Sequence, residues 1–122
     1  GLREFYPGRR IILDFMSHTY SRTEAMLDEF AIALSGADAV ILHDIYPSAR
    51  EHYTGGITGE SLFEATRART TAVDYVPGVM DAVQLAESLV QPGDLFITVG
   101  AGNNWQLGRA LLERLERRER AS

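Results

Sequence analysis

The chain has 122 residues, of which 45% are hydrophobic and 24% charged, and its formal net charge is −5. This length and mixture are typical of one globular domain with its own core, and the negative balance argues against a nucleic-acid-binding protein. Cysteine is absent and all twelve basic residues are arginine, which excludes disulfides, cysteine nucleophiles and a P-loop or Schiff-base lysine within the chain. No apolar run approaches the roughly 20 residues of a membrane span, so we expect a cytoplasmic domain.

Strands and helices alternate along the sequence. Residues 1–8 end in Pro-Gly and are typical of the end of a helix. Short apolar runs predict buried strands, and apolar residues at helical spacing predict helices. We expect strands at 10–15, 38–43, 71–76 and 95–99, and helices at 22–34, 61–68, 79–90 and 103–118. Ser21 or Thr23 is placed to cap the first of these helices, and Gly36 to end it.

The connections between the four expected strands are too long for hairpins, so the sheet should be parallel with right-handed crossovers. The expected fold class is therefore α/β, with residues 1–122 forming one three-layer Rossmann-like domain around a mainly parallel sheet. Ligands of such folds bind at the carboxyl ends of the strands. The segments expected to converge there are 16–23, 44–56, 76–78 and 100–104.

The first of these segments joins a strand to a helix and places His18, Tyr20 and Arg22 between them. Backbone N–H groups at the start of a helix, together with a guanidinium, favour a carboxylate or phosphate ligand. In the alternative interpretation Ser21 caps the helix and Arg22 is solvated on the surface. The residue pattern alone leaves both interpretations open.

Two further segments carry candidate residues. Asp44 ends a strand, where α/β proteins commonly hold a metal or ligand, but it is equally suited to cap its own loop with Arg50 on the surface. Gly100 and Gly102 permit close approach to the backbone, and Asn103 is a suitable helix cap. This glycine segment is not a dinucleotide fingerprint, because its third glycine comes too late and it follows the last strand.

Other common kinds of site are not expected. His18, His43 and His52 lack the spacing of zinc ligands. No G-x-S-x-G elbow is present, which argues against serine hydrolysis.

Four ordered motifs carry a resemblance to a known family. Residues 15–23 are similar to F-Q-P-H-[TR]-[YF]-[ST]-R-T, and blocks at 27–51, 55–65 and 90–115 follow in the family's order. The matching residues of the first motif are Phe15, His18, Thr19, Tyr20, Ser21, Arg22 and Thr23, with Met16 and Ser17 in place of Gln-Pro. The chain resembles the C-terminal domain of the Mur ligases, and specifically of those that add L-alanine during peptidoglycan synthesis. The resemblance covers nearly the whole chain.

The resemblance also implies that the chain is a fragment. The family's uridine-nucleotide domain, its central P-loop domain and an H-H-P-T-E motif would all precede residue 1. The first strand of the C-terminal domain is therefore expected to be missing, and the fragment alone should not catalyse a reaction. The N-terminal and central domains of the same ligase would be its partners, with no role for nucleic acid or a membrane.

The implied activity is ATP-dependent formation of an amide between L-alanine and UDP-N-acetylmuramate. ATP and Mg²⁺ would be bound mainly by the central domain, so we expect no cofactor or metal in this chain. The resemblance assigns Arg22 to the alanine carboxylate, with His18 and Thr19 lining the same site. The residues expected to face the interdomain cleft are Asp44, Arg50, Gly100, Gly102 and Asn103. The alternative function is a standalone Rossmann-like or receiver-like module that binds a small ligand.

Overall fold

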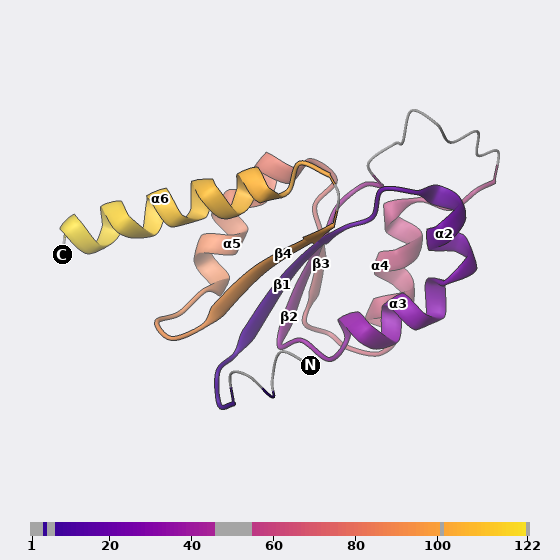
Figure 1. Ribbon diagram of the computed structural model, residues 1–122, viewed down its shortest axis with the longest axis horizontal. Helices are drawn as coiled ribbons and strands as arrows, with labels where there is room; N and C mark the ends of the chain where they lie inside the picture. The colour runs from indigo at the N-terminus through magenta and orange to yellow at the C-terminus, as the bar shows by residue number, and fades with distance from the viewer. Residues whose placement is uncertain (1–3, 5–6, 46–54, 101, 122) are drawn as a thin grey trace.

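The computed structural model describes residues 4, 7–45, 55–100 and 102–121. Its centre is a four-stranded sheet in the order β3-β2-β1-β4 (Figure 1). The strands are β1 (Ile11–Met16), β2 (Ala39–Leu42), β3 (Val73–Tyr75) and β4 (Leu95–Gly100). All neighbouring pairs run parallel. The prediction of a parallel α/β sheet is therefore confirmed, and β1 lies in its middle between β2 and β4.

Helices cover both faces of the sheet (Figure 1). One face carries α2 (Tyr20–Ala25), α3 (Leu27–Leu34) and α4 (Gly59–Arg67). The other carries the short 3-10 helix η1 (Val79–Ala82), α5 (Val83–Leu89) and α6 (Trp105–Ala121). This arrangement is the expected three-layer, Rossmann-like one. None of the described helices combines the length and the apolar character that a membrane crossing needs.

Side chains that alternate along the strands fill two cores, one on each face. In β2, Val40 and Leu42 pack with Leu34 and Leu62 from α3 and α4, whereas Ile41 packs toward α5 and α6. Each of these side chains is almost completely buried. Full burial of such a side chain contributes about 1.5–3 kcal/mol. The continuous apolar runs of the sequence are therefore explained by a sheet that is covered on both sides.

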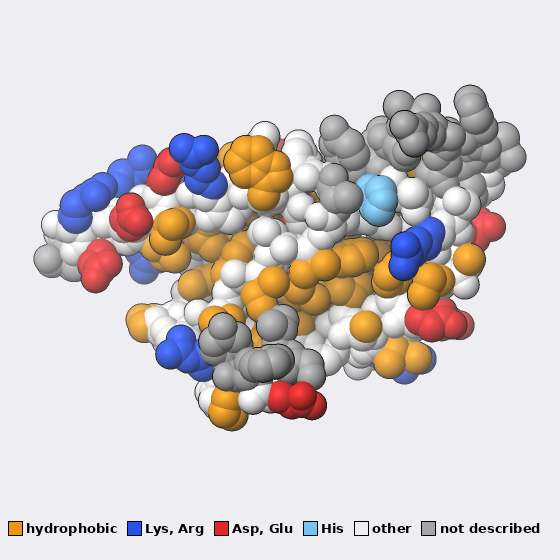
Figure 2. All heavy atoms as spheres, in the orientation of Figure 1, with side chains coloured by type: hydrophobic (Ala, Val, Ile, Leu, Met, Phe, Trp, Pro, Cys, Tyr) orange, Lys and Arg blue, Asp and Glu red, His pale blue; other side chains and the backbone are white. Residues whose placement is uncertain are grey.

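β4 is less well covered than β1 and β2, because it forms one edge of the described sheet. None of its residues is fully buried, and Val99 is 41% exposed. In Figure 2, hydrophobic side chains gather over the middle of the molecule, where Figure 1 places the strands. That a further strand precedes residue 1 stays a prediction.

The prediction of a single helix over residues 22–34 was wrong in two respects, where the helix begins and whether it is continuous. It begins at Tyr20, and Met26, with φ −117° and ψ 26°, divides it into α2 and α3. The Thr23 hydroxyl donates to the Thr19 carbonyl oxygen at 2.6 Å, a local bond of the kind that bends helices. Neither Ser21 nor Thr23 is the cap. Thr19 occupies that position, and no side chain caps the helix there.

The other boundaries differ less. The helix expected at 79–90 begins with the 3-10 turn η1, and the last helix begins at Trp105 rather than at residue 103. Gly36 follows Ser35, the C-cap of α3, as expected. The prediction for residues 1–8 lies largely outside the described residues.

Candidate functional site

A pocket of about 290 Å³ opens at the carboxyl ends of β1 and β4. The end of β1, the turn into α2, one residue of α3 and the end of β4 form its wall. The lining residues are Phe15, Met16, Ser17, His18, Thr19, Arg22, Phe30 and Gly100. The structure therefore brings His18, Thr19 and Arg22 together, and adds Gly100 to them.

The wall of this pocket has a polar part and an apolar part. Arg22 lies in the first turn of α2, is exposed, and forms no ion pair with another described residue. Phe15 and Phe30 pack against each other with ring centroids 5.5 Å apart. A guanidinium beside an aromatic wall suits a small ligand that has a carboxylate and a short apolar group. Because α2 has only six residues, its dipole contributes less to anion binding than a long helix would.

Three hydroxyl-bearing residues fix the turn that precedes Arg22. Thr23 is fully buried and its hydroxyl donates to the Thr19 carbonyl oxygen. The Thr23 oxygen also lies in hydrogen-bond contact with the Ser17 hydroxyl. Since the single Thr23 proton is already used, Ser17 must be the donor. Ser17, one of the two departures from the family motif, therefore ties the end of β1 to α2.

Gly100 allows the ends of β4 and β1 to meet. Its φ is +132°, and a Cβ atom built on it would lie 2.1 Å from the Met16 carbonyl oxygen. Both the backbone angle and the contact require glycine. The close approach foreseen at this glycine is thus to another strand of the same chain.

Asp44 is exposed at the end of β2 and does not line the pocket. The Tyr75 hydroxyl donates a hydrogen bond to the Oδ1 atom of Asp44. Burial, this hydrogen bond and the negative charges of Asp44 and Glu60 raise the pKa of Tyr75 above its ordinary value, so the phenol stays protonated and keeps donating. Arg50 lies outside the described residues.

The turn from β4 into α6 contains Gly102, Asn103 and Asn104. The Asn103 Oδ1 atom is buried and has no hydrogen-bond partner among the residues that the structure describes. Asn104, only 2% exposed, is the residue immediately before the helix. Its side-chain amide nitrogen donates to Asp14 and to the Val99 carbonyl oxygen.

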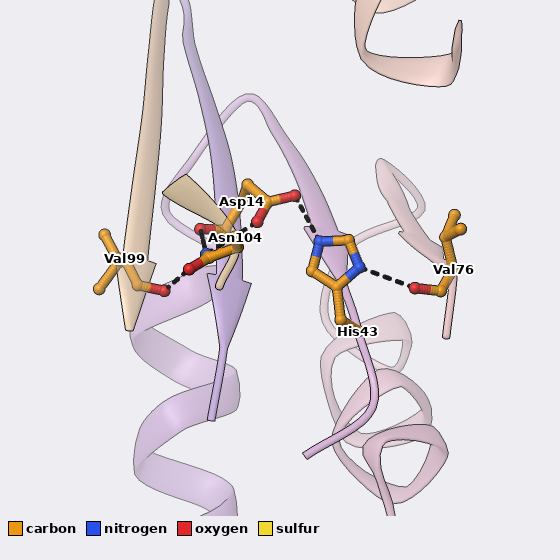
Figure 3. Close-up of polar contacts among 5 residues, drawn as sticks. All are labelled: Asp14, His43, Val76, Val99 and Asn104. Carbon is orange, nitrogen blue, oxygen red and sulfur yellow. Dashed lines mark hydrogen bonds and ion pairs between the residues drawn. The ribbon is translucent and has the colours of Figure 1, made fainter. Parts of the chain in front are cut away.

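A buried polar network joins β1, β2, β3 and the start of α6 (Figure 3). The His43 Nε2 atom lies 2.6 Å from Asp14 Oδ2, and its Nδ1 atom lies 2.7 Å from the Val76 carbonyl oxygen. The Asn104 amide donates to Asp14 Oδ1 at 2.9 Å and to the Val99 carbonyl oxygen at 3.1 Å. Sequence reasoning missed this network. The available signal was Asp14 itself, since a carboxylate in a strand buried on both faces must have partners.

The surroundings of His43 in this network favour its protonated form. Burial alone lowers the pKa of His43, but the hydrogen bond and charge of Asp14, the bond to Val76 and the charge of Asp44 together raise it above the ordinary 6.5. Geometry leads to the same conclusion. A carbonyl oxygen only accepts, so Nδ1 carries a proton, and the Asp14 carboxylate 2.6 Å from Nε2 favours a second proton on the ring.

No group of three metal-ligating side chains gathers among the residues that the structure describes. His18 lies at the pocket, whereas His43 is enclosed by its own partners. His52 is outside the described part of the chain.

A parallel sheet between two helical layers, with a small partly polar pocket at its carboxyl edge, defines a Rossmann-like α/β domain. A family model described as "Mur ligase, glutamate ligase domain" matches residues 1–102. The chain therefore belongs to the Mur ligase family, as a C-terminal domain of that family, which confirms the resemblance of its motifs.

Curated relatives point to one branch of this family. Over 111 residues the chain is 54% identical to a protein of Treponema pallidum (strain Nichols), covering 91% of this chain and 23% of that protein. It is 43% identical to a protein of Borreliella afzelii over 107 residues, covering 88% and 23%. It is 38% identical to one of Desulfosudis oleivorans over 118 residues, covering 96% and 26%. All three are named UDP-N-acetylmuramate--L-alanine ligase. The chain spans about a quarter of the length of these relatives.

Proposed function

We propose that this chain is the C-terminal domain of an ATP-dependent ligase that joins L-alanine to UDP-N-acetylmuramate, and that the pocket beside β1 binds L-alanine. The names of the relatives support the reaction. The pocket is the observation that carries the site, because His18, Thr19 and Arg22 line it together with the apolar surface of Phe15 and Phe30.

In this proposal the residues of the pocket hold and orient the amino acid. The Arg22 guanidinium binds the alanine carboxylate through two parallel hydrogen bonds, which fixes both its position and its direction. Phe15 and Phe30 face the methyl group. The amino group then points out of the pocket toward the muramate carboxyl, which ATP has activated as an acyl phosphate. The C–N bond forms as the C–O bond to phosphate breaks, and the amine loses a proton.

ATP and Mg²⁺ would be held mainly by another domain of the ligase. The chain has no lysine to contact phosphates, and its described residues offer no cluster for a metal. Asp44, with its Tyr75 partner, and the Gly100–Asn103 turn lie at the carboxyl edge of the sheet, where they would face the cleft that closes over the nucleotide. The isolated chain would therefore not catalyse the reaction.

Replacing Arg22 in the complete ligase tests the proposal. A hydrogen bond to a charged group contributes about 1.5–3 kcal/mol, so Arg22→Ala should raise the KM for L-alanine by at least about tenfold. Arg22→Lys should also be harmful, because an ammonium cannot form the two parallel bonds. The KM values for ATP and UDP-N-acetylmuramate should change much less. Steady-state kinetics with each substrate varied in turn measures all three.

Arg69→Ala is the matched control, because Arg69 is an exposed arginine just after α4, away from the pocket. An Arg22→Ala enzyme with the alanine KM and kcat of the Arg69→Ala enzyme would show that Arg22 is only a surface residue. Tight binding of an ATP analogue by the isolated chain would instead favour a standalone nucleotide-binding module.

A further inference from the structure

The network of Asp14, His43 and Asn104 adjoins the pocket without touching its interior. Asp14 precedes Phe15 in β1, and Val99, which accepts from Asn104, precedes Gly100 in β4. Phe15 and Gly100 both line the pocket. Asn104 donates to atoms of Asp14 and to the Val99 carbonyl oxygen, so a single amide joins the two strands directly beside the pocket (Figure 3).

Stability alone does not explain why this network is polar. The side chains of Asp14 and His43 are both completely buried. A buried ion pair is often replaced by apolar residues of similar volume at no cost in stability, because removing two charges from water is expensive. An apolar side chain, however, has no preferred direction, whereas the hydrogen bonds of this network join defined atoms at defined distances. The geometry therefore points to a role in setting the relative placement of strands.

We propose that Asp14, His43 and Asn104 are positioning residues, which hold the ends of β1 and β4 at the separation that the pocket requires. This inference rests on the proposed function. None of the three side chains touches alanine. They act through the backbone of Phe15, Met16 and Gly100.

The network has a built-in dependence on protonation. The charged groups that act on His43 are Asp14 from β1 and Asp44 just after β2, and its other partner is the Val76 carbonyl just after β3. When His43 loses its second proton, the Nε2 lone pair faces the Asp14 carboxylate. That contact becomes repulsive, and Asp14 is left with a partner only on its other oxygen. The strand ends should then shift as the pH rises through the raised pKa of His43.

Two variants separate charge from geometry. In Asp14→Asn, the amide oxygen still accepts from Asn104, and the amide N–H donates to the neutral His43 ring, so the bonds persist without charge. In Asp14→Leu/His43→Leu, the bonds between side chains are lost, while the volume is similar and no buried charge remains. Asp74→Asn is the matched control, because it makes the same change on an exposed residue of β3.

The first measurement is NMR on the chain itself. At pH 6 the wild-type His43 ring should show protons on both nitrogens, and the amide signals of Ser17 and Gly100 should titrate together with it. In Asp14→Asn the ring should carry one proton, and the two amides should no longer follow it. The inference would be overturned by a wild-type His43 ring with only one proton at pH 6. It would also be overturned if the Ser17 and Gly100 amide signals did not change as the ring titrates.

The second measurement is the KM for L-alanine against pH in the complete ligase. Misplacement of a positioned substrate by about 1 Å can cost 100-fold in rate, so a smaller shift of the pocket in the double leucine variant should raise this KM by about tenfold. The KM for ATP should stay unchanged. Asp14→Asn should match the wild type at low pH and remain flat where the wild-type KM rises.

A double leucine variant with the wild-type KM and pH profile would show that the network is merely structural. If that variant does not fold, the pH profile of Asp14→Asn and the titration of the Ser17 and Gly100 amide signals still test the inference. If the wild-type ligase does not use L-alanine, the proposed function fails, and the NMR measurement still tests whether the network sets the geometry of the pocket.

Discussion

Replacing Gly100 with alanine should destabilise the chain by at least about 3 kcal/mol, because two costs add. The φ of +132° is strained for any residue with a Cβ atom, and that atom would lie 2.1 Å from the Met16 carbonyl oxygen. The oxygen belongs to the backbone of the central strand, so no side-chain rotation relieves the contact. Urea unfolding followed by circular dichroism measures the effect, and with a slope of about 1.5 kcal/mol/M the midpoint should fall by about 2 M.

Two other glycines provide matched controls. Gly93→Ala has a φ of +90° but nothing within 4 Å of the added atom, so it should cost only about 1–2 kcal/mol. Gly56→Ala has neither a positive φ nor a contact, and should change the stability by less than about 0.5 kcal/mol. If Gly100→Ala is no more destabilising than Gly93→Ala, the close approach of β4 to β1 is not a real constraint.

Three further predictions concern other parts of the fold. The raised pKa of His43 gives the folded chain a stabilisation that is fully present below pH 6.5. The unfolding free energy of the wild type should therefore exceed that of Asp14→Asn by an amount that falls as the pH rises above 6.5, by up to about 1.4 kcal/mol per pH unit. This difference should level off once the pH passes the folded-state pKa. An advantage that grows with pH would contradict the assigned charge. Thr58→Ala should cost about 1 kcal/mol in urea unfolding, because it removes the hydroxyl that accepts from the Ser61 backbone N–H at the start of α4. The chain alone should be only marginally stable and should self-associate through the open β4 edge. Val99→Lys should self-associate less. A wild-type chain that sediments as a monomer and is stable in thermal unfolding would refute this.

The sheet was predictable because burial on both faces leaves a clear trace in the sequence. The run that contains Val40, Ile41 and Leu42 is apolar at every position, which only a strand covered on two sides tolerates. The bend at Met26 left no such trace. The apolar stripe continues through it, and the hydrogen bond that Thr23 makes to a backbone carbonyl in the preceding turn cannot be read from that stripe.

The candidate site was predictable in its sequence-local part. His18, Thr19 and Arg22 lie within five positions, so a single turn brings them to one wall of the pocket. Phe30 joins that wall from another helix, and the position of its ring depends on how α3 packs against β1. The Asp14–Asn104 contact spans 90 positions, and neither residue indicates its partner. Long-range pairing of this kind follows from the assembled fold alone.

The central place of β1 has a consequence for how the chain folds. Its neighbour on one side, β2, follows after a single helical connection, but its neighbour on the other side, β4, comes about 80 positions later. Because such distant contacts form late, a chain emerging from the ribosome would hold β1 with one open edge until β4 had been made. Asp14 would stay hydrated during that time, since Asn104 arrives only with the start of α6. We therefore expect that docking of the start of α6 withdraws this carboxylate from water.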